Sequence, residues 1–384
     1  MQHFYFDHNA TTPVAPEVLE TAVSCLGQVY GNASSIHHFG QAAKQRLEAA
    51  RRQVSALIHS SPAEIVFTSG GTEADNLAIF GAIRAAGSPR VHLITSAIEH
   101  SAVLAPSAQL EREGVAVTRL PVSAGGTVNP EDLRRALRPE TVLVSIMHAN
   151  NELGTVQPIA EISRITREAG VLLHVDGVQA LGKIAVDVDA LGVDLYSISG
   201  HKFYAPKGVG ALFVRKGTKL APTTFGGHHE RDRRPGTENV PGIAALGAAA
   251  ELAGRTLSAE SERLASLRDR LESWVLDRIS GAGINGARWN RTPNTSNIYF
   301  DGIDGEAMVI ALDLRGFAVS TGSACSSGAI TPSHVLIALG LSADRARSSL
   351  RFSLGRSNTA EQVDALCDAL AASVTHLRRI SVHA

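Results

Sequence analysis

The chain is poor in the residues that mark several common classes of protein. It has only three cysteines, Cys25, Cys325 and Cys367, and none forms a CxxC pair or lies at the spacing of a Cys/His metal site. Such a sparse and odd set argues against a disulfide framework and against a structural zinc site. It is typical of a reducing compartment, so we expect a cytoplasmic protein.

Long apolar runs and an excess of charge are missing as well. No stretch approaches the roughly 18 apolar residues that a membrane-spanning helix needs, and the N-terminus lacks the basic flank and apolar core of a signal peptide. The 36 Lys and Arg residues nearly cancel the 37 Asp and Glu residues. This balance gives no general electrostatic reason to bind nucleic acid or an anionic membrane. We therefore expect a soluble protein with neither as its partner.

What the chain does contain is a regular alternation of strand-like and helix-like segments. Short apolar runs such as 65–68, 142–147 and 171–175 alternate with helical stretches such as 159–169. This order predicts an α/β fold with a mainly parallel sheet. Because 384 residues are too many for one simple core, we expect a large domain and a smaller one, connected by a long helix over 257–279.

A glycine-rich turn follows the first of these strands. The run Thr68-Ser69-Gly70-Gly71-Thr72-Glu73 lies between a strand and a helix. Glycines let the backbone close around an anion, and the free N–H groups of a helix N-terminus bind phosphate. Taken alone, such a turn is more often ordinary loop structure, and it matches neither the dinucleotide fingerprint nor the nucleotide-binding P-loop. A phosphorylated ligand that is not a nucleotide is the better interpretation.

Two polar strand ends form a stronger signal. Asp176 ends an apolar strand, and Lys202 follows the next strand within Ser199-Gly200-His201-Lys202. The carboxyl edge of a parallel sheet is where such folds build their sites. A buried Asp keeps a pyridine nitrogen protonated and a lysine amine forms a Schiff base with an aldehyde, which together predict pyridoxal 5'-phosphate. A helix-capping Asp and a surface Lys are the alternative, but the phosphate turn upstream favours the cofactor.

His100 and Cys325 add reactive groups to the same prediction. His100 ends the strand after the phosphate turn, where an imidazole can stack on a flat ring and move protons near neutral pH. Cys325 lies in the small, polar run 320–329, which we expect to be a mobile loop with an exposed, reactive thiol. A cysteine is more often a small buried hydrophobe, and we assign that role to Cys25 and Cys367.

An arginine at a predicted strand end is the last candidate. The alternating run from Leu350 ends on Arg356. A guanidinium suits bidentate capture of an amino-acid carboxylate. Surface arginines are common, so the spacing alone leaves a substrate-binding role and a plain surface role equally open.

Longer motifs extend this pattern over nearly the whole chain. They are DHNATTP at 7–13, GNASSIHHFG at 31–40, EIVFTSGGTEADNLAI at 64–79, HANNELGTVQPI at 148–159, HVDGVQALGK at 174–183, SGHKFYAPKGVG at 199–210, GGHHERDRRPGTEN at 226–239, STGSACSSGAITPSHVL at 320–336 and RFSLGR at 351–356. With these motifs the chain resembles the NifS/IscS-type cysteine desulfurases, which are pyridoxal-phosphate enzymes of fold type I in the class V aminotransferase group.

The resemblance implies a fold, an activity and partners. The fold would be that of a fold-type I transferase, with a large domain over 14–256 around a mainly parallel sheet. Residues 1–13 and 257–384 would form a smaller α/β domain that carries the Cys325 loop. The activity would be removal of sulfur from L-cysteine, giving L-alanine and a persulfide on Cys325, for iron–sulfur cluster assembly or other sulfur transfer. The partners would be a second copy of the chain, in a homodimer, and a sulfur-acceptor protein such as an iron–sulfur scaffold or a thiolation protein.

The matched motifs also imply residue roles. The catalytic residues would be the Schiff-base lysine Lys202, the stacking acid–base histidine His100 and the persulfide carrier Cys325. The cofactor would be held by Asp176 at the pyridine nitrogen, Gln179 at the phenolic oxygen, Asn151, and a phosphate cup of Gly71, Thr72, Ser199, His201 and, across the dimer interface, Thr237. The substrate carboxylate would be bound by Arg356, Asn151 and Asn32. No metal ligands are implied.

Other functions remain as alternatives. A selenocysteine lyase or an aminotransferase would share the cofactor site, although an aminotransferase has no need of a cysteine in a mobile loop. A non-catalytic sulfur-relay protein is a different class, and the complete set Asp176, Lys202 and His100 argues against it. The sequence ends at Ala384 without the C-terminal extension that IscS-type members use to dock the iron–sulfur scaffold, a departure that leaves open which acceptor protein is the partner.

Overall fold

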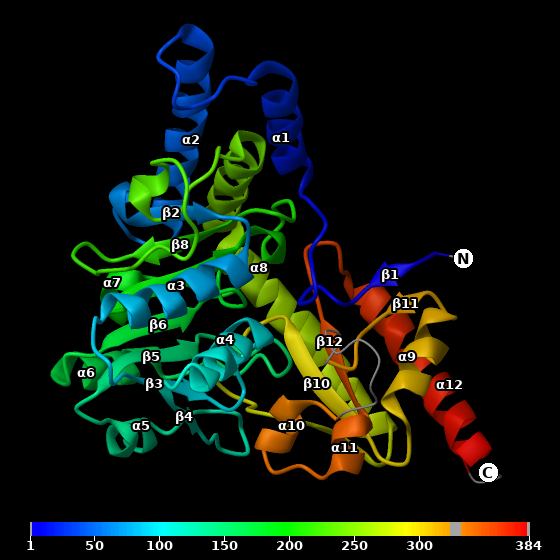
Figure 1. The fold of residues 1–384 in the computed structure, drawn as a ribbon. Helices are drawn as coiled ribbons and strands as arrows, with labels where there is room; N and C mark the ends of the chain where they lie inside the picture. Colours follow the sequence, from blue (N-terminus) through cyan, green and yellow to red (C-terminus); the bar gives the residue numbers. More distant parts are fainter. Residues whose placement is uncertain (1, 323–331, 382–384) are drawn as a thin grey trace.

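A seven-stranded sheet organises the larger part of the molecule (Figure 1). The computed structural model describes residues 2–322 and 332–381. In spatial order the strands are β2 (Ile65–Thr68), β8 (Gly210–Val214), β7 (Leu195–Ser199), β6 (Leu172–Asp176), β5 (Thr141–Met147), β3 (His92–Ser96) and β4 (Ala116–Leu120). From β7 to β4 all neighbours are parallel, whereas β8 runs antiparallel to both β7 and β2. The predicted α/β fold with a mainly parallel sheet is confirmed.

Helices cover both faces of this sheet because its strands are apolar on both sides. One face packs against α3 (Gly71–Ala85) and α4 (Ser101–Arg112). The opposite core includes α1 (Pro16–Gln28), α2 (His38–Leu57), α5 (Pro130–Ala136), α6 (Ile159–Glu168) and α7 (Val188–Leu191). Three short 3-10 helices complete this part, η1 (Pro62–Glu64), η2 (Gly200–Lys202) and η3 (Glu230–Asp232). Among the helices described, none combines the length and apolar composition that crossing a bilayer requires.

The longest helix, α8 (Val240–Arg278), belongs to two hydrophobic cores. Its first half packs with α1 and α2, and its second half contributes Leu264, Leu271 and Val275 to the second core. Asn239 caps the helix, with its side chain accepting a hydrogen bond from the main-chain nitrogen of Gly242. The sequence predicted this helix only over 257–279. Its first half was missed because 243–253 consists almost entirely of small apolar residues and has no polar face to give a helical period.

The second core lies around a three-stranded antiparallel sheet. Its strands, in spatial order, are β12 (Ser349–Ser353), β10 (Thr295–Phe300) and β9 (Ala282–Ile284). A separate parallel pair joins β1 (Phe4–Tyr5) to β11 (Phe317–Ala318). The helices of this region are α9 (Gly305–Asp313), α10 (His334–Ala338), α11 (Ala343–Arg347) and α12 (Ala360–Ser381). The domain limits predicted from the sequence remain a prediction; the one at 256/257 falls inside α8.

A buried polar network lies between α3 and the sheet. The His174 imidazole on β6 lies 2.8 Å from the Ser145 hydroxyl on β5 and 2.9 Å from the Ser197 hydroxyl on β7. The Asp75 carboxyl of α3 approaches His174 Nε2 at 3.5 Å. Burial raises the pKa of Asp75 to about 7, against the opposing effect of the Ser197 hydroxyl. Burial also lowers the pKa of His174 to about 4, so both groups are uncharged in weakly acidic solution.

Asp75 should therefore make the protein less stable as the pH rises. An unfolded Asp ionises near pH 4, and the folded carboxyl holds its proton until about pH 7. The folded state binds more protons in this window, so the free energy of unfolding falls with pH by at most about 1.4 kcal/mol per pH unit. Asn does not titrate, so the stability of cofactor-free Asp75→Asn relative to the wild type should increase from pH 5 to pH 7 and then level off. Urea denaturation at each pH measures this difference.

The exposed Glu161→Gln provides a matched control, because it removes a carboxyl from the surface of α6. Its stability relative to the wild type should stay flat over the same range. An Asp75→Asn difference that is equally flat would contradict the buried, protonated carboxyl.

Candidate active site

The carboxyl edge of the large sheet gathers residues that the sequence predicted for one site. β6 ends at Asp176, and its parallel neighbour β7 ends at Ser199. The 3-10 helix η2 follows β7 directly and carries Lys202 at its end. The predicted acid and amine are therefore presented by neighbouring strand ends.

The Lys202 amine is held by the N-terminal arm. Its Nζ donates to the carbonyl oxygens of Asn9 at 2.7 Å and Ala10 at 2.8 Å. The buried Asn9 side chain continues the connection, donating to the carbonyl oxygen of Asn151 at 3.0 Å and the hydroxyl of Thr295 at 2.8 Å. The sequence singled out no residue in this arm. The available signals were the motif DHNATTP at 7–13, to which no residue role was given, and its polar character directly after the apolar stretch 4–6.

The Asp176 carboxyl is buried and accepts one hydrogen bond, from the main-chain nitrogen of Val178 at 2.9 Å. Burial, and then the charge of Asp75, raise its pKa to about 7, while His100, the Val178 N–H and His174 act in the other direction. A cationic group placed against this carboxyl would offset the cost of burying its charge. A protonated pyridine nitrogen is such a group.

His100 is the N-cap of α4. Its Nδ1 accepts a hydrogen bond from the main-chain nitrogen of Ala102 at 3.1 Å, so in the neutral ring the proton is on Nε2. Burial lowers the pKa of His100, Asp176 raises it, and Lys202 and His334 lower it. Because His100 responds to the charges of both Asp176 and Lys202, the three predicted residues lie in one electrostatic neighbourhood. His334, which the sequence did not single out, donates from Nε2 to the carbonyl oxygen of Glu99 at 3.0 Å.

The turn entering α3 lies against the same strand ends. A Cβ added to Gly71 would lie 2.7 Å from Cγ2 of Val178 and 3.3 Å from Cβ of Ser199, so only glycine fits there without movement. The neighbouring Thr72 is exposed at the first turn of the helix. Backbone N–H groups at a helix N-terminus suit a phosphate. The contacts of Gly71 bring this predicted phosphate turn next to Ser199 and to the segment after Asp176.

Gln179 and His201 join the site through the N-terminal arm. Gln179 donates from Nε2 to the carbonyl oxygen of Asn9 at 3.0 Å. The His201 Nδ1 lies 3.1 Å from the Thr11 hydroxyl. Burial, followed by the charge of Lys202, lowers the pKa of His201 to about 4. A neutral imidazole at this place can donate one hydrogen bond to an anion.

The predicted carboxylate-binding residues are only partly brought together. Arg356 and Lys202 line one cavity, in which the Arg356 guanidinium lies 5.6 Å from the centre of the Tyr204 ring. Asn151 connects to Lys202 through Asn9, as described above. Asn32 lies exposed between α1 and α2, where its side chain accepts from the main-chain nitrogen of Ser34 at 2.9 Å. No described contact of this single chain links Asn32 to Arg356.

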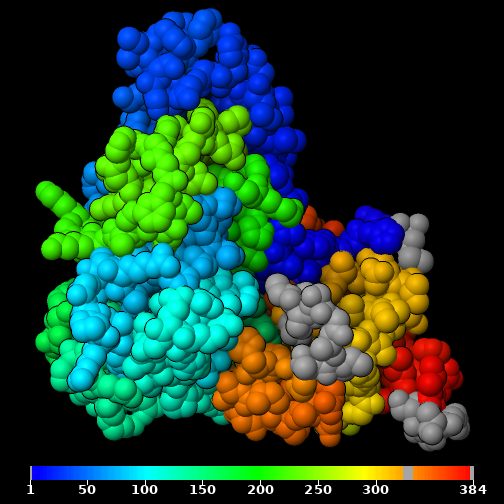
Figure 2. Space-filling model, in the orientation of Figure 1, coloured from blue at the N-terminus to red at the C-terminus, as the bar shows by residue number. Residues whose placement is uncertain are grey.

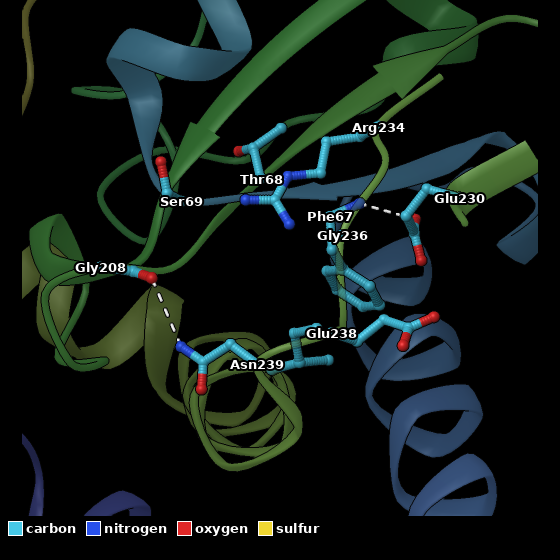
Figure 3. Close-up of a pocket in the computed structure, with 10 residues that line it drawn as sticks. Phe67, Thr68, Ser69, Gly208, Glu230, Arg234, Gly236, Glu238 and Asn239 are labelled. Atoms are coloured by element: carbon cyan, nitrogen blue, oxygen red, sulfur yellow. Dashed lines mark hydrogen bonds between the residues drawn. The ribbon is translucent and has the colours of Figure 1, made fainter. Parts of the chain in front are cut away.

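The segment 226–239 lies beside the phosphate turn. Arg234 pairs with Glu73 at 2.8 Å, and Glu73 also accepts from the main-chain nitrogen of Ser69 at 2.7 Å. Glu230 accepts from the main-chain nitrogen of Phe67 at 2.8 Å, and Figure 3 shows this contact beside Thr68 and Ser69, with the Arg234 side chain nearby. These bonds fix a segment whose Thr237 is exposed.

Cys325 lies outside the described residues, and so does most of the run 320–329. The described residues on either side of the undescribed segment, Gly322 and Ser333, both lie next to the buried carboxyl of Glu152. Glu152 accepts from the Ser333 hydroxyl at 2.6 Å, and a Cβ added to Gly322 would lie 2.8 Å from the Glu152 carboxylate. Burial raises the pKa of Glu152, and the Ser333 hydroxyl acts in the other direction.

Known proteins resemble the chain over nearly its full length. Residues 4–366 match the family described as aminotransferase class-V. A protein named cysteine desulfurase IscS from Dictyoglomus turgidum is 49% identical over 98% of this chain and 96% of its own. A solved structure titled NifS-like protein is 37% identical, with a TM-score of 0.92 over 98% of this chain and all of that one. Another, titled SspA in complex with cysteine, is 37% identical, with a TM-score of 0.81 over 91% of this chain and 98% of that one.

Enzymes of this family depend on pyridoxal phosphate, and the described residues suit it. The buried Asp176 carboxyl suits a protonated ring nitrogen, and the gap preserved by Gly71 beside Ser199 suits a phosphate. The Lys202 amine lies at the neighbouring strand end, where an aldehyde would be bound. In fold, in length and in the arrangement of these groups, the chain belongs to the class-V aminotransferase family and, within it, to the cysteine desulfurases.

Proposed function

We propose that this chain removes sulfur from L-cysteine, releases L-alanine and carries the sulfur as a persulfide on Cys325. The observation that carries this proposal is the meeting, at one sheet edge, of the buried Asp176 carboxyl, the Lys202 amine and the His100 imidazole. Relatives named cysteine desulfurase and a solved relative in complex with cysteine support the substrate. From Cys325 the sulfur passes to an acceptor protein, in iron–sulfur cluster assembly or another sulfur-transfer route.

The cofactor side of the site is formed by strand and helix ends. Bound pyridoxal phosphate supplies an aldehyde that takes the amine of an amino acid and a ring that withdraws electrons from its α carbon. Asp176 would hold a proton at the ring nitrogen, and Gln179 would donate to the phenolic oxygen. The phosphate would be held by Gly71, Thr72, Ser199 and His201, with Asn151 also contacting the cofactor. Lys202 would hold the aldehyde, and its free amine would take the proton from Cα of the substrate.

The substrate side provides binding and proton transfer. Arg356 and Asn151 bind the cysteine carboxylate through charge-assisted hydrogen bonds. His100 moves a proton from Nε2 during attack on the substrate sulfur. The Cys325 thiolate attacks that sulfur: the Cβ–S bond breaks, an S–S bond forms, and protons delivered to the carbon skeleton complete alanine. Free cysteine and one protein thiol thus give alanine and one protein persulfide, with no external oxidant.

Replacing Cys325 separates cofactor binding from sulfur transfer. Cys325→Ser should keep the yellow cofactor and bind cysteine, because the thiol takes no part in either step. Alanine and sulfide formation with a thiol reductant present should fall at least about 1000-fold, the usual scale for loss of a nucleophile. Alanine release and mass spectrometry of the Cys325 peptide measure the two products. Cys25→Ser, which changes a buried cysteine of α1, is the control and should retain activity. Full turnover by Cys325→Ser would refute the role of Cys325.

The proposed homodimer is supported by an exposed apolar surface. Leu19, Val23 and Leu26 lie at helical spacing on α1 and are between 51% and 68% exposed. Tyr30 and Ile36 extend this surface over the loop to α2, and Figure 2 shows α1 and α2 together at one end of the molecule. Contiguous exposed apolar patches of this kind mark protein interfaces. In the dimer, Thr237 would reach the phosphate of the other copy, and Asn32 would reach Arg356 across the interface.

A charge placed in this surface should weaken the dimer. Leu26→Asp buries an unpaired carboxylate in each half of the interface, so the dissociation constant should rise at least tenfold, or about 1.4 kcal/mol. Sedimentation velocity over a range of concentrations measures the change. Leu314→Asp, which alters an equally exposed leucine just after α9, is the matched control and should remain dimeric. A wild-type protein that stays monomeric at micromolar concentration would overturn the proposal.

A further inference from the structure

Lys183 is a lysine with almost no access to solvent. Its side chain follows the turn after β6 and is 7% exposed. The amine donates to the Asn9 side-chain oxygen at 3.0 Å and, through a short contact, to Oε1 of Gln179. Burial, and then the charges of Lys202 and Arg351, hold its pKa well below the usual range of lysine. Burying a lysine amine costs free energy unless the amine is paired, and here it is paired with Asn9 and Gln179.

Both acceptors of Lys183 also serve the cofactor site. Gln179 donates from Nε2 to the carbonyl oxygen of Asn9 at 3.0 Å, and the same carbonyl oxygen accepts from Lys202 at 2.7 Å. The Asn9 side-chain oxygen therefore accepts from Lys183, and the Asn9 main-chain oxygen accepts from both Gln179 and Lys202. One short chain of hydrogen bonds links the buried amine to the groups proposed to bind the aldehyde and the phenolic oxygen.

Lys183 and the Asn9 carbonyl oxygen together orient the Gln179 amide. The two ends of an amide are nearly equal in shape, and their hydrogen-bond partners decide their orientation. In the structure Oε1 accepts from the Lys183 amine, and Nε2 donates to the Asn9 carbonyl oxygen, which can only accept. Nε2 then uses one N–H on Asn9 and keeps the second for a ligand. Without Lys183, Oε1 loses its donor and only the Asn9 carbonyl holds the amide, so the orientation that presents an N–H to the phenolic oxygen is held less firmly.

We propose that Lys183 is a positioning residue of this site, which fixes the Gln179 amide as a donor to the phenolic oxygen and holds Asn9 where its carbonyl accepts Lys202. The proposal rests on the proposed function in one respect, namely that pyridoxal phosphate is bound at Lys202. It adds a residue whose amine donates to Asn9 and to Gln179. Lys183 acts through Gln179, which would donate to the phenolic oxygen, and through Asn9, whose carbonyl oxygen accepts from Lys202.

The test is a pH titration of the visible absorbance of the cofactor-loaded protein. Loss of a proton from the lysine–cofactor linkage leaves more negative charge on the phenolic oxygen, and a donor at that oxygen stabilises this form. The donor therefore lowers the pH midpoint of the colour change. Lys183→Met removes the group that orients the donor, so the midpoint should rise by about one pH unit. Lys183→Ala should give the same direction and carries the test if the Met variant does not fold.

A double-mutant cycle shows whether Lys183 acts through Gln179. Gln179→Leu should raise the midpoint by a similar amount, and adding Lys183→Met to it should shift the midpoint no further. Ser261→Ala is the matched control, because the Ser261 hydroxyl donates to the main-chain oxygen of Lys183 at 2.8 Å and does not touch its amine. Its midpoint should equal that of the wild type, even if its thermal stability falls.

The possible outcomes separate this inference from the proposed function. A midpoint that moves with Gln179→Leu but not with Lys183→Met or Lys183→Ala would overturn the positioning role. Shifts that add fully in the double variant would overturn the route through Gln179. If Lys183→Met shifts the midpoint as expected but the cofactor-loaded wild type makes no alanine from cysteine, the proposed function alone is overturned.

Discussion

The two hydrogen bonds from the Lys202 amine to the carbonyl oxygens of Asn9 and Ala10 determine how the rest of the site is arranged. They fix the amine at the edge of the large sheet with a segment from the start of the chain. The Asn9 side chain connects the same point to Asn151 and to Thr295 on β10. Because buried polar groups are costly when unpaired, these bonds hold four distant parts of the sequence in one arrangement.

The second constraint is the burial of carboxyl groups beneath the site. Burial raises the pKa of Asp176 and Asp75 to about 7 and that of Glu99 to about 8. A cationic group would stabilise the charged form of these buried carboxyls, and the nearby N-terminus of α3 favours anions. A ligand with a basic ring nitrogen at one end and a phosphate at the other suits both features.

The sequence predicted those parts of the site that follow from local patterns. Asp176 and Lys202 stand out because each ends or follows a short apolar strand, and Gly71 stands out because a glycine pair enters a helix. The confirmed α/β fold rests on the same alternation. Asn9 could not be found this way, since its bonds to Lys202 and Lys183 span 193 and 174 residues of sequence. Lys183 lies only four residues after Gln179, but the local pattern does not show that its amine is buried against the arm. His334 was missed for the same reason, and the proposed roles of Asn32 and Thr237 require a second copy of the chain.

A crystal structure of the protein loaded with pyridoxal phosphate tests the central claim most directly. The account predicts continuous electron density between Nζ of Lys202 and the cofactor, with the Asp176 carboxylate at the ring nitrogen and the phosphate beside Gly71. Density joining the cofactor to a different lysine, or a ring nitrogen far from Asp176, would contradict it.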